Sequence, residues 1–287
     1  MAEIVKNLLR KYKIRPSKRF GQNFLIDKIV LKKIVATANL QPRDIILEIG
    51  PGTGILTKEL AKKVKKVIAI EKDPEMVKIL QEATQDLKNV KIIQGDILEL
   101  NPKRYNLKPK TYKVVANLPY YITSPVIRKF LELPKARPRI MVLMVQKEVA
   151  QRITAKPPNM NLLAVSVQFY AKPNIMSYVS KRSFWPQSKV DSAIIKIVPH
   201  KSALIGINYN LFFEIVRAGF SQPRKQLINN LSRLNFSSKN LGGQAKYLKI
   251  HRQKIKNWLL KNKIQPDQRA ETLSIRDWLK LTGTFRL

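Results

Sequence analysis

Short runs of apolar and β-branched residues alternate with helix-like segments along the first two thirds of the chain. The apolar runs cover residues 45–47, 67–70, 90–93, 114–116 and 140–145. The segments between them repeat apolar residues at helical spacing, over residues 55–64, 74–83, 123–133 and 147–154. Strands and helices in alternation are typical of a parallel sheet that is covered on both faces. With two further runs, 167–178 and 192–198, the pattern predicts an α/β fold with a mostly parallel seven-stranded sheet.

After Pro199 the strand-like pattern stops and helical spacing takes over, in residues 211–218, 222–231, 253–260 and 275–281. Ser274 and Asp277 form a capping box before the last helix, and Gly283 is expected to end it. Asp27 similarly predicts the start of an early helix over residues 28–38. We therefore expect three parts: a basic N-terminal segment (1–26), an α/β domain (27–199) and a small C-terminal α-helical domain (200–287).

A glycine-rich loop, Glu48-Ile49-Gly50-Pro51-Gly52-Thr53-Gly54, follows the first predicted strand directly. Glycine lets the backbone turn sharply and approach a ligand closely. Glu71 ends the second strand, where a carboxylate can accept both hydroxyls of a ribose. Asp96 follows the third strand, where it can accept from an adenine amino group. Because ligands of open α/β sheets bind at the carboxyl ends of strands, these residues predict a site for an adenosine-containing cofactor. The alternative is that Glu71 and Asp96 only cap helices.

The spacing of the glycines separates two kinds of cofactor. A dinucleotide fingerprint has the form G-x-G-x-x-G, and Ile55 occupies the place of its third glycine. S-adenosylmethionine contains no pyrophosphate and fits the loop better. We therefore expect S-adenosylmethionine as the cofactor.

The segment Asn117-Leu118-Pro119-Tyr120 follows the fourth predicted strand and suits a planar amino group. The side-chain carbonyl of Asn117 and the backbone carbonyl of Leu118 can accept its two N–H bonds. A residue before proline is held extended, which keeps the Leu118 carbonyl out of a helix, and Pro119 itself brings no N–H donor. The ring of Tyr120 can stack on the attached base, although core packing is the simpler interpretation of an aromatic residue here.

The net charge of +36 is unevenly distributed. Ten of the nineteen acidic residues fall between Asp44 and Glu99, whereas residues 101–199 hold eighteen Lys and Arg against three acids. Residues 200–287 hold seventeen against four. A strongly cationic surface predicts a polyanionic partner, nucleic acid above all. A lysine-rich but merely solvated surface is the alternative.

Composition excludes several other kinds of site. The chain has no cysteine and two histidines, His200 and His251, so thiol nucleophiles, disulfides and His- or Cys-built metal sites are not expected. The longest clean apolar run, residues 140–145, is far too short to cross a membrane, and no signal peptide is recognisable. We expect a cytoplasmic protein without metal or membrane partner, and a monomer by default.

Together, these motifs resemble the rRNA adenine N6,N6-dimethyltransferases. The resemblance is carried by Phe20-Gly21-Gln22-Asn23-Phe24-Leu25, the glycine loop, Glu71, Gly95-Asp96 and Asn117-Leu118-Pro119-Tyr120. The small-subunit branch is further indicated by Phe184-Trp185-Pro186 with Val190-Asp191-Ser192, and by the stretches 219–227 and 229–231. The similarity runs from about residue 19 to residue 281.

The resemblance implies a Rossmann-like class I methyltransferase that dimethylates two adjacent adenines in the 3′-terminal hairpin of small-subunit rRNA, within the assembling subunit. It implies a cofactor site formed by Asn23, Leu25, Gly50, Gly52, Glu71, Asp96, Ile97 and Asn117. Phe184 would cover the second face of the target base, unless it only packs in the core. Arg224 and Lys225 would bind RNA phosphates. Pro223 stands where the family usually has arginine, and Ser188 where proline is common.

Three other functions remain open from the sequence. A large-subunit rRNA methyltransferase of the antibiotic-resistance type shares the cofactor motifs but usually has isoleucine at the position of Leu118. A DNA adenine methyltransferase uses a related Asn/Asp-Pro-Pro-aromatic site. A ribosome assembly factor could keep the fold and bind the small subunit without essential catalysis, although Glu71, Asp96 and Asn117 are intact.

Overall fold

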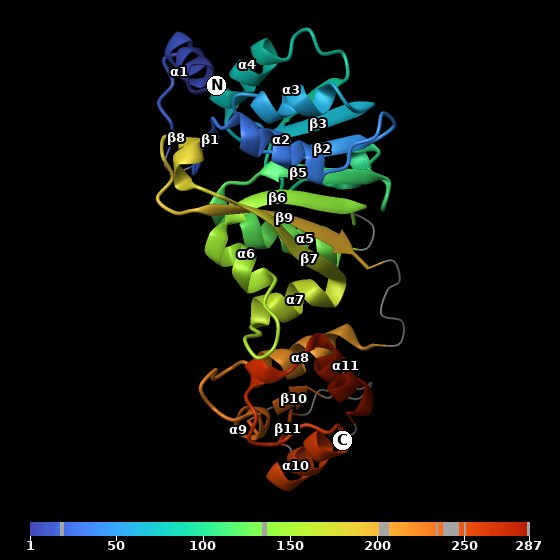
Figure 1. Cartoon of the computed structure of the whole chain (residues 1–287). Helices are drawn as coiled ribbons and strands as arrows, with labels where there is room; N and C mark the ends of the chain where they lie inside the picture. The colour runs from blue at the N-terminus through green and yellow to red at the C-terminus, as the bar shows by residue number, and fades with distance from the viewer. Residues whose placement is uncertain are drawn as a thin grey trace. The chain divides into compact units, whose positions relative to one another are not determined.

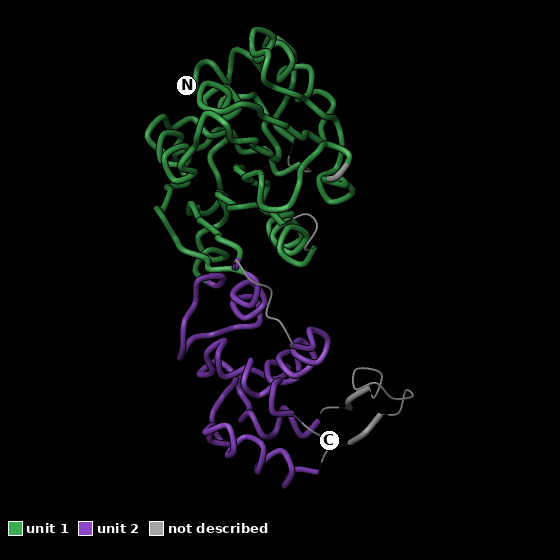
Figure 2. Tube along the Cα trace, turned by 90° about the vertical axis from the view of Figure 1, so that its right-hand side faces the viewer, with its two compact units in different colours: residues 1–151, 171–199 green, residues 152–170, 200–287 purple. Residues whose placement is uncertain are grey.

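Figure 1 shows the computed structural model of the chain, which describes residues 1–17, 20–133, 137–200, 207–233, 235–237, 247–249 and 251–285. Internal contacts divide the chain into two compact units, coloured separately in Figure 2. The first contains Met1–Gln151 and Ala171–Pro199, and the second contains Arg152–Tyr170 and His200–Leu287. The second unit therefore includes a segment from the middle of the sequence, which the expected boundary at residue 200 had left in the α/β domain.

The first unit is built on a seven-stranded sheet with the order β4-β3-β2-β5-β6-β9-β7. Its strands are β2 (Ile45–Ile49), β3 (Lys66–Glu71), β4 (Val90–Gln94), β5 (Tyr112–Asn117), β6 (Ile140–Gln146), β7 (Ala171–Val179) and β9 (Ser192–Pro199). The five strands from β4 to β6 are parallel, and β9 runs antiparallel to both of its neighbours. The predicted mostly parallel seven-stranded sheet is confirmed.

Neighbouring residues of a strand point to opposite sides of the sheet, and in the central strands β2, β3, β5 and β6 both sets are buried. On one face, Ile46, Val67 and Val115 join the core formed with α2 (Lys28–Thr37) and α3 (Ile55–Ala61). Residues of the opposite face, such as Leu47 and Val114, are fully buried as well. The remaining helices of this layered unit are α4 (Pro74–Ala83), α5 (Thr123–Glu132) and α6 (Lys147–Ile153) (Figure 1).

The topology gathers the carboxyl ends of β2, β3, β4 and β5 at one edge of the sheet. From β2 the chain builds outward through β3 and β4, then returns to place β5 on the other side of β2. Such a reversal of strand order opens a crevice at the carboxyl edge, where α/β proteins bind their ligands. The fold thus brings the segments after Ile49, Glu71, Gln94 and Asn117 into one region.

The N-terminal segment contains a helix that the sequence analysis did not predict, α1 (Ala2–Lys11). Its buried residues Val5 and Leu9 form a small core with Phe24, Met76 and Ile79. The side chains of Lys11 and Tyr12 both hydrogen-bond to Glu82, which follows one turn later on α4. A two-residue strand, β1 (Phe24–Leu25), then pairs antiparallel with β8 (Phe184–Trp185). This pairing sets the Phe20–Leu25 motif beside Phe184, 159 residues away from Leu25.

The second unit is mainly helical and has its own core. Its helices are α7 (Leu162–Tyr170), α8 (Tyr209–Gly219), α9 (Leu227–Leu231), α10 (Arg252–Lys261) and α11 (Ile275–Thr284), with a short hairpin of β10 (Asn235–Ser237) and β11 (Tyr247–Lys249). Trp278 is completely buried in this core and lies against Gly219, where even a methyl group would collide with the indole ring. The predicted capping box of Ser274 and Asp277 is confirmed.

Three expected elements differ from the structure. Residues 167–170, expected as strand, belong to α7, because Val165 and Phe169 turn into the helical core and the strand begins only at Ala171. The helix expected over residues 222–231 is shortened to α9, so Pro223 lies in the preceding turn and not in a first helical turn. Finally, α11 continues past Gly283 by one residue.

Candidate active site

The glycine loop at the end of β2 adopts a conformation that other residues rarely take. Gly50, Gly52 and Gly54 have φ values of 63°, 55° and 76°. At Gly52 a Cβ atom would also lie 3.1 Å from the ring of Phe24. The loop therefore needs glycine at this position both for its backbone angle and for the close approach of the N-terminal motif.

Glu71, the last residue of β3, is fixed beside this loop. Its carboxylate accepts hydrogen bonds from the backbone N–H of Gly52, at 3.1 Å, and of Asp73, at 2.9 Å. Burial raises the pKa of Glu71, and the two backbone bonds oppose that rise. The two bonds hold the carboxyl group near the N-terminus of α4, and Glu71 lines the cavity described below.

Glu48 is the second buried carboxyl group of the site. It is 1% exposed, and burial raises its pKa to about 8, with a smaller contribution from the charge of Glu71 and an opposing one from the Thr57 hydroxyl. The side chain is therefore neutral at pH 7 unless a cation approaches it. Two carboxyl groups in one cavity form a strong potential site for positive charge.

Asp96 follows β4 and is the third acidic residue at this edge. Its carboxylate accepts from the backbone N–H of Leu98 and pairs with the ammonium group of Lys72, both at 2.8 Å. Partial burial alone would raise the pKa of Asp96, but Lys72 and the Leu98 N–H outweigh it and lower the pKa. Asp96 is thus an ionised acceptor whose position is set from two sides.

Asn117 ends β5 with its side-chain carbonyl available. The amide nitrogen donates to the backbone oxygen of Asn23 at 3.3 Å, which fixes the orientation of the group. Leu118 is anchored by its own N–H, which donates to the Met144 carbonyl, and by its buried side chain. Within the described ranges, no residue donates a hydrogen bond to the Leu118 carbonyl. Two carbonyl acceptors of adjacent residues are therefore open.

Pro119 and Tyr120 complete this segment. Pro119 is extended, with φ −55° and ψ 130°, and leads into the short helix η2 (Tyr120–Ile122). The hydroxyl of Tyr120 lies 2.7 Å from the hydroxyl of Ser192 and 3.2 Å from that of Ser188. The ring itself is half-buried and lines the cavity.

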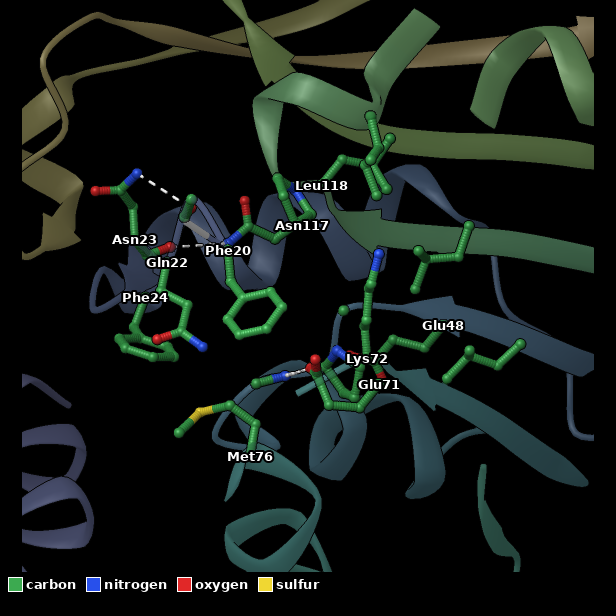
Figure 3. Close-up of a pocket in the computed structure, with 18 of the residues that line it drawn as sticks. Phe20, Gln22, Asn23, Phe24, Glu48, Glu71, Lys72, Met76, Asn117 and Leu118 are labelled. Atoms are coloured by element: carbon green, nitrogen blue, oxygen red, sulfur yellow. Dashed lines mark hydrogen bonds between the residues drawn. The ribbon is translucent and has the colours of Figure 1, made fainter. Parts of the chain in front are cut away.

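A single cavity of the first unit joins these groups (Figure 3). All of the predicted cofactor and catalytic positions line it, namely Asn23, Leu25, Gly50, Gly52, Glu71, Asp96, Ile97, Asn117, Leu118, Pro119, Tyr120 and Phe184. Phe184 is 2% exposed and also packs in the core, so one side chain serves both as cavity wall and as core residue. Arg224 and Lys225 belong to the second unit, where both are exposed in the turn between α8 and α9.

Several residues that shape this site were not predicted from the sequence. Gln22 donates to Asp73 at 2.7 Å and accepts from the backbone of Ser17, which ties the N-terminal motif to the start of α4. Lys72 and Met76 also line the cavity. The position of Gln22 within the Phe20–Leu25 motif was the available signal, whereas nothing local in the sequence pairs it with Asp73.

In the second unit, Asn230 holds the turn between α8 and α9, a role that was not predicted from the sequence. It is 1% exposed, and its amide donates to the backbone oxygens of Gly219, at 2.6 Å, and Gln222, at 3.0 Å. These bonds fix the turn that carries Arg224 and Lys225.

Among the described residues, neither a metal site nor a membrane-spanning helix is present. In that part of the chain, His, Asp and Glu side chains form no group of three or more that could hold a metal ion. The helices of the same residues include none that is long and apolar enough to cross a membrane.

The chain is similar to known proteins over nearly its whole length. The model of the family described as ribosomal RNA adenine dimethylase matches residues 14–284. A ribosomal RNA small subunit methyltransferase A from Dehalococcoides mccartyi is 43% identical over 277 residues, which cover 96% of this chain and 90% of that protein. The protein of the same description from Caldanaerobacter subterraneus is 40% identical, covering 96% and 98%.

Solved structures give the same result for the fold. A dimethyladenosine transferase from Plasmodium falciparum superposes with a TM-score of 0.76 at 31% identity, covering 90% of this chain and 95% of that one. The 23S rRNA methyltransferase ErmE superposes with a TM-score of 0.72 at 26% identity, covering 91% and 98%. The expected Rossmann-like methyltransferase fold is confirmed, and this chain belongs to the ribosomal RNA adenine dimethylase family.

Proposed function

We propose that this protein transfers methyl groups from S-adenosylmethionine to N6 of two adjacent adenines in the 3′-terminal hairpin of small-subunit rRNA, during assembly of the subunit. The observation that carries the proposal is the fixed amide of Asn117, whose nitrogen donates to Asn23 and whose oxygen, at the wall of the cavity, accepts no hydrogen bond from any described residue. The names of the curated relatives support the small subunit as the substrate.

The cavity suits the proposed cofactor in charge and in hydrogen bonding. S-adenosylmethionine supplies an electrophilic methyl group on a sulfonium, and it carries further positive charge on its amino group. Glu71 would accept from the ribose hydroxyls and Asp96 from the adenine amino group. The buried carboxyl groups of Glu48 and Glu71 line the cavity, and a bound cation would favour their ionised forms.

The chain's part in the reaction follows from the two open carbonyls. An adenine N6 is a weak nucleophile because its lone pair is delocalised into the ring. The Asn117 side chain and the Leu118 backbone would accept its two N–H bonds and stabilise the positive charge that develops on nitrogen, as an oxyanion hole does for the opposite sign. The proton then leaves a cationic nitrogen, so water suffices as its acceptor. In-line positioning provides the rest of the acceleration.

The target base has to leave its stack before it can enter the cavity, at a cost of a few kcal/mol. Tyr120 and Phe184 would then hold it between their rings. Arg224 and Lys225 of the second unit would bind the phosphate backbone. In the first unit, a groove lined by Lys147, Lys181 and Lys189 offers a further phosphate site, although Glu148 and Asp191 also line it.

A protein with this substrate would work in the cytoplasm. One copy of the chain supplies every residue of the proposed site, so a monomer suffices.

Methyl transfer from labelled S-adenosylmethionine tests the proposal. Small subunits lacking the modification, large subunits and duplex DNA are assayed in parallel, and nucleosides are identified by mass spectrometry. We expect N6,N6-dimethyladenosine confined to small-subunit RNA. Label in the large subunits would instead indicate a 23S rRNA methyltransferase, the activity that the name of ErmE gives. Binding to small subunits without methyl transfer would indicate an assembly factor.

A further inference from the structure

The hydroxyl of Tyr120 lies between two buried serine hydroxyls. Ser192 is completely buried and lies 2.7 Å from it, and Ser188, 3% exposed, lies 3.2 Å from it. Ser192 is the first residue of β9, and Ser188 belongs to the loop just before that strand. The contact therefore joins the loop after β5, which carries the target-base site, to a segment about 70 residues further along the chain.

The direction of these hydrogen bonds follows from counting protons. Ser188 has one hydroxyl proton, and it donates this proton to the Val190 carbonyl at 2.9 Å. Ser188 also accepts from the Val190 N–H at 3.3 Å. Tyr120 must therefore be the donor toward Ser188, and because Tyr120 also has one proton, Ser192 must donate to Tyr120. The hydrogen bonds are therefore donated in series, from Ser192 to Tyr120, from Tyr120 to Ser188, and from Ser188 to the Val190 carbonyl.

This arrangement leaves the Tyr120 hydroxyl fully used. Its proton is given to Ser188 and its oxygen accepts from Ser192, and both serines are buried. The group is therefore unavailable as a proton acceptor for the N6 amino group, and what Tyr120 presents to the cavity is its ring. The ring is held at both ends, by the backbone of η2 and by its hydroxyl.

We propose that Ser188 is a positioning residue, which fixes the Tyr120 ring so that a stacked adenine presents N6 to the methyl donor. The inference rests on the proposed function. A displacement of the base by a fraction of an ångström reduces the rate of an in-line transfer strongly.

The second methyl transfer should depend on this device more than the first. A monomethylated amino group offers one N–H in place of two, so one carbonyl acceptor loses its partner. The position of the base then relies more on stacking. Loosening the Tyr120 ring should therefore slow the second transfer more than the first, and N6-monomethyladenosine should accumulate.

The test is a double-mutant cycle in the full chain with Tyr120→Phe, Ser188→Ala and the combination of both. We expect each single variant to lose roughly three- to tenfold in kcat, the range expected for one buried hydrogen bond. Because both changes remove the same bond, the combination should be no slower than Tyr120→Phe. Monomethyladenosine should rise in all three variants, and Ser188→Thr, which keeps the hydroxyl, should restore the wild-type product ratio.

Two controls keep the outcome interpretable. Affinity for S-adenosylmethionine, measured by calorimetry, should be the same for all variants, since none of the changed groups belongs to the proposed cofactor contacts. Ser166→Ala removes a serine hydroxyl from α7 in the second unit and should leave both rate and product ratio unchanged.

Additive losses in the cycle, or a product ratio that stays at the wild-type value, would overturn the role of Ser188. A wild-type protein that transfers no methyl group to small-subunit RNA would instead overturn the proposed function itself. The two failures are therefore distinguishable in a single set of assays.

Discussion

Glu48 is the most unusual ionisable side chain of the cavity, because it is buried and forms no ion pair with any described residue. Its pKa is raised from 4.5 to about 8 by burial. Between pH 4.5 and about pH 8 the folded protein therefore keeps a proton on Glu48, whereas the unfolded chain has released it. Folding is favoured at the acidic end of this window, and the contribution is lost as pH rises toward 8.

We expect the Glu48→Gln variant to abolish this pH dependence, because glutamine resembles the protonated acid and does not titrate. Between pH 5 and 8 the wild type should lose free energy of unfolding relative to the variant, with a limiting slope of about 1.4 kcal/mol per pH unit. Urea unfolding at a series of pH values measures the difference. A constant difference across this range would show that Glu48 titrates normally.

Gly52 tests the need for a left-handed backbone in the cofactor loop. The Gly52→Ala variant adds a methyl group 3.1 Å from the Phe24 ring at a φ of 55°. We expect affinity for S-adenosylmethionine to fall at least tenfold, at a strain cost of about 1 kcal/mol or more. The matched control is Gly283→Ala in α11, where no atom lies within 4 Å of the added group. That change should stabilise the fold by about 0.5–1 kcal/mol. An equal loss of affinity for S-adenosylmethionine in the Gly52→Ala and Gly283→Ala variants would contradict the account.

The Phe20–Leu25 motif of the N-terminal segment lines the cavity, and a few contacts between elements hold it there. Gln22 joins Ser17 to Asp73, the N-cap of α4, and Lys11 and Tyr12 bond to Glu82 on the same helix. The Phe20–Leu25 motif is thus attached to α4 as well as to β8. Its contribution to cofactor binding should depend on this attachment.

Gln22→Ala removes the attachment without creating a large cavity in the core, since Gln22 is only half-buried. We expect cofactor affinity to fall about threefold to tenfold, the effect of one or two hydrogen bonds, while the urea midpoint changes little. Isothermal titration of S-adenosylmethionine measures the loss. Gln41→Ala, at an exposed position before β2, is the control and should bind normally. Unchanged affinity of Gln22→Ala would show that the attachment of the Phe20–Leu25 motif to α4 does not contribute to cofactor binding.

Much of this site could be predicted because it follows strand order. Gly50, Glu71, Asp96 and Asn117 each stand just after, or at the end of, one of four consecutive parallel strands, and parallel strands end at the same edge. No long-range information was needed to bring them together. The same argument predicted the seven-stranded sheet, because its strands are short, apolar and separated by helical periods.

The contacts that could not be predicted join residues with no common local pattern. Gln22 meets Asp73 across 51 positions, and Tyr120 meets Ser192 across 72. The membership of α7 was also hidden, because apolar and polar residues alternate from Val165 to Phe169, a pattern that favours a strand over the helix that forms. Only packing against the second core decides between them.

Charge governs how the molecule meets its substrate. The chain carries a net charge of +36, so association with RNA should be steered electrostatically and should weaken as salt rises. Lys147, Lys181 and Lys189 line one groove of the first unit, and none of them forms an ion pair with any described residue. The Lys147 ammonium lies over the exposed ring of Tyr178, at 5.4 Å from its centroid.

Neutralising two of these lysines tests the groove as a phosphate site. The double variant Lys181→Gln with Lys189→Gln should raise the dissociation constant for small-subunit RNA and reduce its salt slope by roughly 1 to 2. The control is Lys63→Gln with Lys65→Gln, an equal charge change at exposed positions before the amino end of β3, at the opposite edge of the sheet. If the two double variants change the dissociation constant and the salt slope equally, the groove is no specific phosphate site and only the net charge of the protein matters.

The central claim is that Asn117 holds the amino group of an adenine for methyl transfer. Its most direct test is single-turnover transfer by the wild type and by Asn117→Ala to small subunits lacking the modification, with saturating S-adenosylmethionine. Mass spectrometry of the 3′-terminal RNA fragment then locates the products. The account predicts N6,N6-dimethyladenosine at two adjacent positions for the wild type. It predicts a rate at least a hundredfold lower for the variant, the loss expected when one charge-stabilising contact is removed. Near-normal transfer by Asn117→Ala would contradict the account.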